Sequence, residues 1–115
     1  MADAPTVYEV YAVKYAERDA HRAEHFLGGD PHDTPMPMDY FVWAIVGPDK
    51  TWVVDTGFAE LDAATRQRRL LRPVTDALAT VGVEASSVSD VIITHLHYDH
   101  VGGHQQFPNA RFHLQ

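Results

Sequence analysis

Cysteine is absent from the 115-residue sequence. This absence excludes disulfide bonds, thiolate ligands to zinc and a cysteine nucleophile, so any metal ion must be held by nitrogen and oxygen donors. Apolar runs long enough to span a bilayer are also absent, and no signal sequence of charged, apolar and small residues opens the chain. We therefore expect a cytoplasmic protein with no membrane partner.

Basic residues are scarce. The sequence has 9 Lys and Arg against 16 Asp and Glu, which gives a formal net charge of -7. Non-specific nucleic-acid binding depends on basic patches that displace counterions, so we expect no nucleic-acid partner. The one basic cluster, formed by Arg66, Arg68, Arg69 and Arg72, has no interleaved aromatic residues. It is more typical of a solvated helix face than of a nucleic-acid interface.

Histidine, by contrast, is concentrated in one short stretch. Three of the eight histidines and one carboxylate fall close together, as His95, His97, Asp99 and His100. The apolar run 91–93 precedes them, and the pair Gly102 and Gly103 follows. A lone histidine in such a place is usually an ordinary surface or capping residue. Four potential ligands behind a β-branched run instead indicate a metal site at the end of a strand.

The spacing of these residues indicates how they would bind metal. Side chains two apart in an extended segment point the same way, so His95 and His97 can present their imidazoles to one ion. Asp99 and His100 follow where the chain must turn, and they can face a second centre. Imidazole nitrogen and carboxylate oxygen suit zinc, and also iron, manganese or nickel.

Two motifs in this order resemble a known family. The pattern His95-x-His97-x-Asp99-His100, followed by two glycines, is similar to the signature of the metallo-β-lactamase superfamily of hydrolases. The upstream segment 53–57, Val-Val-Asp-Thr-Gly, matches that family's other N-terminal motif. Within the family, residues 39–43 and the Leu and Tyr of the histidine motif are most similar to the N-acyl-homoserine lactonase-like branch.

The resemblance implies a four-layer αββα sandwich, which is a mixed α/β (α+β) fold. It covers only the N-terminal half of that fold. The family's later ligands, a histidine, a bridging aspartate and a last histidine, have no plausible position in the sequence. We therefore interpret residues 1–115 as a single partial domain whose C-terminal half is absent, with exposed apolar surface and possible self-association.

The resemblance also implies a reaction. His95 and His97 would hold one ion and Asp99 and His100 another. Zinc is the expected metal, with iron or manganese as alternatives, and Asp99 would also be catalytic as a general acid. Asp55 would not bind metal but would steady the histidine loop by hydrogen bonding. The expected substrate is a small molecule, a lactone or related ester such as an N-acyl-homoserine lactone. Alternatives are a thioesterase of the glyoxalase II type, a diiron oxygen-reducing or persulfide-oxidising relative, and a non-catalytic metal-binding fragment.

Hydrophobic periodicity predicts the strands. We expect them at 6–15, with apolar residues on both faces, at 41–46, which should be buried, and at 51–55, 90–94 and 110–114. The Gly-Pro-Asp-Lys segment 47–50 predicts a hairpin turn. The alternation of helix and strand around 90–94 indicates an α/β layer.

The remaining segments are predicted to be helical or irregular. A helical stripe runs through Leu70, Val74, Leu78 and Val81, with a start or kink at Pro73 and a stop at Gly82. A short helix is expected at 104–107. Residues 26–38, which are rich in glycine and proline, should be irregular. Their methionines, Met36 and Met38, would either form an apolar wall for a substrate or pack the loop onto the body.

Overall fold

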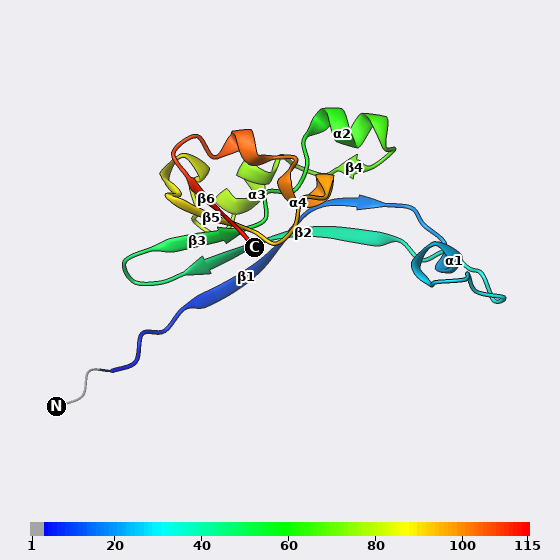
Figure 1. The fold of residues 1–115 in the computed structure, drawn as a ribbon, viewed down its shortest axis with the longest axis horizontal. Helices are drawn as coiled ribbons and strands as arrows, with labels where there is room; N and C mark the ends of the chain where they lie inside the picture. The colour runs from blue at the N-terminus through cyan, green and yellow to red at the C-terminus, as the bar shows by residue number, and fades with distance from the viewer. Residues whose placement is uncertain (1–3) are drawn as a thin grey trace.

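The computed structural model describes residues 4–115, in which six strands form one mixed sheet (Figure 1). The strands are β1 (Glu9–Arg18), β2 (Met38–Val46), β3 (Thr51–Val54), β4 (Arg69–Leu70), β5 (Asp90–Ile93) and β6 (Arg111–Leu114). The helices are α1 (Arg22–His25), α2 (Glu60–Thr65), α3 (Val74–Ala79) and α4 (Tyr98–Val101), with short 3-10 turns η1 (Ala85–Ser87) and η2 (His104–Gln106). The predicted mixed α/β (α+β) class is confirmed.

The connections between strands place two strand ends side by side. The sheet order is β4-β1-β2-β3-β5-β6, with β1, β2 and β3 antiparallel and β5 parallel to both β3 and β6. The predicted hairpin turn is closed by the Gly47 N–H, which donates to the Lys50 carbonyl at 2.9 Å. The crossover from β3 to β5 contains α2, β4 and α3. Because β3 and β5 are parallel, their carboxyl ends meet at one edge of the sheet, where ligands bind in many α/β proteins.

One face of the sheet carries the core. Helices α2, α3 and α4 lie on the same side of it in Figure 1. The fully buried side chains come from both layers and include Tyr15, Val42, Val53, Val91 and Ile93 of the sheet and Phe58, Val74, Leu78 and Phe107 of the layer above. Burying one such aliphatic or aromatic side chain contributes about 1.5–3 kcal/mol, so this interface is the main source of stability.

The opposite face of the sheet is exposed. Val10 is 64 % exposed, Trp43 42 % and Phe41 39 %, while their neighbours Val42 and Ala44 are fully buried. The prediction that the first strand packs on both faces and that residues 41–46 are buried is therefore wrong for alternate residues. The helices within residues 4–115 cover only one side of the sheet, and side chains of a strand alternate between the two sides.

The predicted helical stripe is partly wrong. Leu70 belongs to the short strand β4, where it pairs with Ala16 of β1. The helix α3 begins after Pro73 and buries Val74 and Leu78, and Gly82 ends the segment with a φ of 77°, as predicted. Leu70 and Val74 are four residues apart, which is a helical spacing, but they belong to different elements. The spacing was misleading because both residues face the same core.

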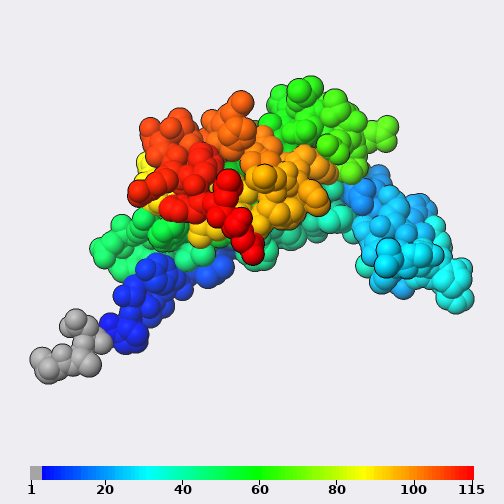
Figure 2. All heavy atoms as spheres, viewed as in Figure 1, coloured from blue at the N-terminus to red at the C-terminus, as the bar shows by residue number. Residues whose placement is uncertain are grey.

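An arm projects from the body of the molecule (Figure 2). It consists of α1 and the irregular segment 26–37, and a single bridge between His21 and Pro35 closes its base. Irregular structure at 26–38 is thus largely confirmed, since β2 begins at Met38. Met36 is 38 % exposed and Met38 37 %, so neither is packed into the core. None of the helices within residues 4–115 combines the length and hydropathy needed to cross a membrane.

A buried carboxylate fixes the other end of the parallel strands. Asp90, at the start of β5, is 1 % exposed. It accepts a bond from His113 Nε2 at 2.8 Å and from the Ser89 hydroxyl at 3.1 Å, and it forms an ion pair with Lys50. The Lys50 ammonium and then the His113 imidazole hold the pKa of the Asp90 carboxyl well below its usual range. The Lys50 contact thus ties the β2–β3 turn to β5, and the His113 contact ties β6 to it.

Asp90 should therefore contribute to the stability of the fold. Its pKa is lower in the folded than in the unfolded chain, so its contribution is complete above the unfolded value of about 3.9 and is lost as pH falls below that value. We expect Asp90→Asn to lower the thermal unfolding midpoint at pH 7, and to reduce the further loss of stability below about pH 4. Asp49→Asn, in the exposed turn next to Lys50, is the matched control. Equal midpoints for the two variants at pH 7 would contradict this role.

Candidate metal centre

The two sequence motifs meet where β3 and β5 end. The two strands are in register, with Val53 opposite Val91 and Val54 opposite Ile92. One residue further, the Asp55 N–H donates to the Ile92 carbonyl at 2.8 Å. Asp55 and Thr94 therefore leave the sheet at the same edge, and the histidine loop begins beside the aspartate motif.

Asp55 is the buried centre of this loop. It is 3 % exposed and has a φ of 63°, a left-handed conformation that aspartate tolerates better than most residues. Its Oδ1 accepts the Thr94 backbone N–H at 2.9 Å, and its Oδ2 lies 2.6 Å from His100 Nδ1. The Thr94 hydroxyl lies 3.0 and 2.9 Å from the two carboxylate oxygens. The interpretation of Asp55 as the residue that steadies the loop agrees with these contacts.

These contacts show which ring nitrogen of two histidines is engaged by the protein. A carboxylate accepts hydrogen bonds, so His100 Nδ1 donates to Asp55 Oδ2, and His100 Nε2 lies on the other side of the ring, 3.5 Å from Asp99 Oδ2. The single Thr94 hydroxyl hydrogen is directed to Asp55, so its 3.1 Å contact with His95 Nδ1 must be donated by the histidine. Nε2 is therefore the nitrogen of each ring that remains for a metal ion, and histidines held in this way through their other nitrogen are common in metal sites.

Three of the four predicted ligands cluster. One potential ligand atom from each of His95, Asp99 and His100 lies within 4.8 Å of the others. His100 Nε2 is 3.5 Å from Asp99 Oδ2, and the ring centroids of His95 and His100 are 3.9 Å apart. His97 is not in this group, although its ring centroid is 4.7 Å from that of His95. The donors are nitrogen and oxygen, which fits a divalent ion such as zinc, and the division of ligands between two ions stays a prediction.

The glycine pair brings the two motifs into backbone contact. A Cβ on Gly103 would lie 2.2 Å from the Thr56 carbonyl oxygen, and one on Gly102 would lie 2.4 Å from the Tyr98 carbonyl oxygen. In this close approach the Thr56 N–H and hydroxyl donate to the His100 carbonyl at 2.7 and 3.0 Å. The Gly103 N–H donates to the Gly57 carbonyl at 3.0 Å. The histidine loop is therefore fixed by its backbone as well as by Asp55.

Sequence reasoning missed a second group of contacts, around Tyr98. Arg68 Nε donates to the Tyr98 hydroxyl at 3.0 Å, and the Arg66 guanidinium carbon lies 3.8 Å from the centre of the Tyr98 ring. The Tyr40 and Tyr98 hydroxyls are 3.4 Å apart, and burial, with the bond to Tyr98, raises the pKa of Tyr40 to about 12. Only the aromatic residue inside the motif hinted at this group.

The arginine cluster is thus not a solvated helix face. The helix α2 ends at Thr65, and Gln67 has a left-handed φ of 58°, so the arginines that follow do not share a helix. Arg69 instead bonds to Glu17 at 3.2 Å and to Asp19 at 2.9 Å. The sequence prediction failed because it extended α2 beyond the turn.

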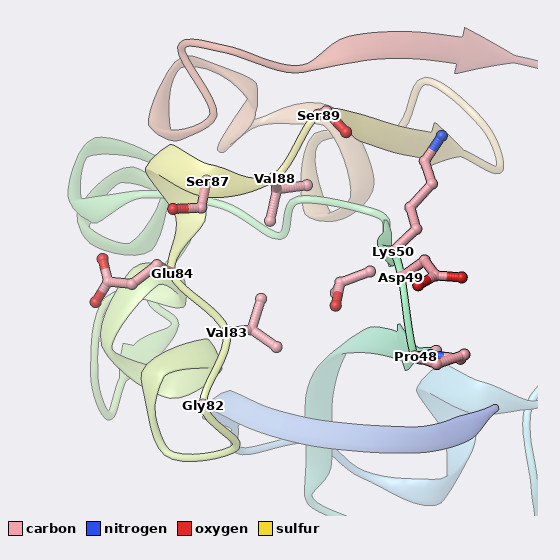
Figure 3. A pocket seen from close by; sticks show the side chains of 11 residues that line it. Pro48, Asp49, Lys50, Gly82, Val83, Glu84, Ser87, Val88 and Ser89 are labelled. Carbon is pink, nitrogen blue, oxygen red and sulfur yellow. The ribbon is translucent and has the colours of Figure 1, made fainter.

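A cavity elsewhere in the molecule contains none of these residues. It has a volume of about 500 Å³ and is lined by residues of the β2–β3 turn, including Asp49 and Lys50, and of the segment 82–89 (Figure 3). These residues precede β3 and β5, whereas Asp55 and His95 follow them. The cavity therefore lies at the opposite end of the parallel strands from the histidine loop. His32, between Asp30 and Asp33, also lies apart, in the arm.

The comparisons with known proteins agree with the motifs. Residues 36–114 match the family model of the metallo-β-lactamase superfamily. The chain belongs to this superfamily. No curated protein matches the chain.

Several solved structures share the fold of the chain. A quorum-quenching N-acyl homoserine lactone lactonase is 20% identical, with a TM-score of 0.69 over 90% of this chain and 43% of that one. AidC, a dizinc quorum-quenching lactonase in complex with a product, is 19% identical, with a TM-score of 0.64 over 94% and 43% of the two chains. An N-acyl homoserine lactone hydrolase with N-hexanoyl-L-homoserine at its catalytic metal centre is 18% identical, with a TM-score of 0.63 over 91% and 46%. The chain thus spans less than half the length of each of these structures.

The close approach at Gly103 predicts a steric effect. Gly103 has a φ of -97°, which alanine can adopt, so only its Cβ contact with the Thr56 backbone opposes a side chain. We expect Gly103→Ala to lower the free energy of unfolding by about 2–3 kcal/mol, measured by chemical denaturation. Gly82→Ala is the control, since a Cβ there meets nothing within 4 Å and only its left-handed backbone costs about 1 kcal/mol. A smaller loss for Gly103→Ala than for Gly82→Ala would contradict the steric explanation.

The contacts of Asp55 predict a combined loss of stability and metal affinity. Asp55→Asn keeps the size of the side chain but replaces one acceptor oxygen by an NH₂ donor. The Thr94 N–H, the Thr94 hydroxyl and His100 Nδ1 all donate to this side chain, so one of them would lose its acceptor. We expect it to lower the free energy of unfolding by about 1–3 kcal/mol and to weaken zinc binding about 10–100-fold, measured by denaturation and by competition with a chelating dye. Asp76→Asn, on the exposed side of α3, is the control. Unchanged zinc affinity in Asp55→Asn would exclude a role in orienting His100.

Proposed function

We propose that the protein is a metal-dependent hydrolase that uses two zinc ions to open a lactone or a related ester, such as an N-acyl-homoserine lactone. The observation that carries the proposal is the convergence of His95, Asp99 and His100, in which Thr94 and Asp55 engage Nδ1 of the two histidines and leave Nε2 of each ring for a metal ion. The superfamily supports a metal-dependent hydrolase in general. The lactone substrate is supported by the structural neighbours, two of which hold homoserine products, one of them at its catalytic metal centre.

The residues of the chain have distinct roles in this proposal. His95 and His97 would hold one ion, and Asp99 and His100 the other. Ions held in this way polarise a carbonyl group and lower the pKa of a bound water to near 7. Asp99 would also hold a proton at its carboxyl oxygen and pass it to the alkoxide that leaves when the lactone ring opens. Asp55 would take no part in proton transfer, because Thr94 and His100 already occupy its oxygens.

Metal binding tests the first part of the proposal. We expect the purified protein to contain at least one zinc ion per chain by elemental mass spectrometry, and His95→Ala or Asp99→Ala to lose most of it. His32→Ala, an exposed histidine of the arm, should keep the metal content of the wild type. Iron in place of zinc would favour the oxidative relatives, and a chain without metal would refute the proposal.

Hydrolysis tests the second part. The protein should open N-hexanoyl-homoserine lactone, lose this activity on treatment with a chelator and regain it with zinc. Asp99→Asn should lower kcat by about 10²-fold or more, since it removes both a ligand and a proton carrier. A zinc-loaded protein that cleaves thioesters of small acids but no lactone would replace this proposal by the glyoxalase II-type thioesterase.

A further inference from the structure

The side chain of Tyr98 is held on three sides. It lies between His97 and Asp99 in the chain and begins α4. Arg66 covers one face of its ring, Arg68 donates to its hydroxyl, and the Tyr40 hydroxyl lies 3.4 Å from that hydroxyl. Phe58 packs against the same ring, with a distance of 5.6 Å between centroids.

The turn after α2 is shaped to deliver both guanidinium groups. The Arg68 backbone N–H donates to the Ala63 carbonyl at 2.8 Å, and Arg68 Nη1 donates to the Arg66 carbonyl at 2.6 Å. Gln67 between them has a φ of 58°. The left-handed residue reverses the chain, so that Arg66 and Arg68 reach the ring and the hydroxyl of one tyrosine. Backbone strain of this kind, at a residue other than glycine, persists where other contacts require it.

The two arginines do not serve as ordinary surface ion pairs. Within residues 4–115, no carboxylate oxygen lies within 4.0 Å of the charged nitrogens of Arg66 or Arg68, whereas Arg69 pairs with both Glu17 and Asp19. A guanidinium stacked on an aromatic ring is attracted to the face of the ring, and one that donates to a half-buried hydroxyl adds a directional bond. Both contributions act on Tyr98.

Tyr98 can transmit this restraint to the ligands. Its carbonyl accepts the Gly102 N–H at 2.9 Å, which closes the single turn of α4. The next carbonyl, that of Asp99, accepts the Tyr15 hydroxyl at 3.4 Å. The contacts of the ring and of the backbone together restrain the orientation of α4. This orientation sets the direction of the Asp99 carboxylate relative to His100 Nε2, 3.5 Å away.

We propose that Arg66 and Arg68, by holding Tyr98, are positioning residues that orient Asp99 and His100 for metal binding. This inference rests on the proposed function, because it assumes that these two residues bind metal. Arg66 and Arg68, in the turn after α2, lie outside both sequence motifs and would nevertheless support the site.

Cobalt(II) binding by the protein tests the inference, because the visible spectrum of cobalt reports the geometry of its ligands. Tyr98→Phe removes the hydroxyl but keeps the ring, and Arg68→Gln removes the charge. We expect both to weaken cobalt binding about 10-fold and to alter the spectrum. Arg68→Lys, which keeps the charge and a donor, should recover part of the affinity. Arg69→Gln is the matched control, since its partners Glu17 and Asp19 lie on the first strand or just after it.

Thermal unfolding of the metal-free variants separates positioning from folding. Tyr98→Phe and Arg68→Gln should unfold within a few degrees of Arg69→Gln while differing from it in cobalt affinity. Wild-type affinity and spectrum in both variants would overturn the inference alone, as would a loss of affinity matched by a large loss of stability. A wild-type protein that binds no cobalt would instead refute the proposed function, and this inference with it.

Discussion

The hydrogen bonds of Asp55 are the constraint on which the site depends. They join two segments 39 residues apart in the chain, and they place a carboxylate that is 3 % exposed against a backbone amide, a hydroxyl and an imidazole. An ionised group this deeply buried is stable only when it is paired or fully hydrogen-bonded. Any rearrangement of the histidine loop would withdraw donors from it. The loop is therefore fixed before a ligand arrives, and the left-handed backbone at Asp55 is tolerated because these bonds require it.

The parallel pairing of β3 and β5 makes this meeting possible. An antiparallel pair would have placed the residue after β3 and the residue after β5 at opposite edges of the sheet. A parallel pair needs a crossover, and α2, β4 and α3 supply it on one face. The same crossover carries Arg66 and Arg68 to Tyr98, so the connection that produces the parallel pair also supports the loop.

The sequence predicted what depends on local pattern. Apolar runs located β1, β2, β3, β5 and β6 but not β4, Pro73 located the start of α3, and the clustered histidines located three residues that do converge. Tyr98 and Arg68 could not be paired in this way, because a bond between residues 30 apart leaves no periodic signal. The exposure of Phe41 and Trp43 was missed for a related reason. An apolar run indicates a strand that can be buried on both faces, but it does not show which residues pack against each face.

The two ends of β5 show what distinguishes a site from a structural ion pair. Asp90 and Asp55 are both buried carboxylates that touch an imidazole. At Asp90 two cations, Lys50 and Arg111, pair with the carboxylate, and the His113 contact uses Nε2. The carboxylate is therefore fully engaged in joining β5 to β6 and to the β2–β3 turn. At Asp55 no Lys or Arg pairs with the carboxylate within residues 4–115, and the His100 contact uses Nδ1. In this second arrangement Nε2 faces Asp99, so a cation held between them would also stabilise the buried Asp55 carboxylate through its positive charge.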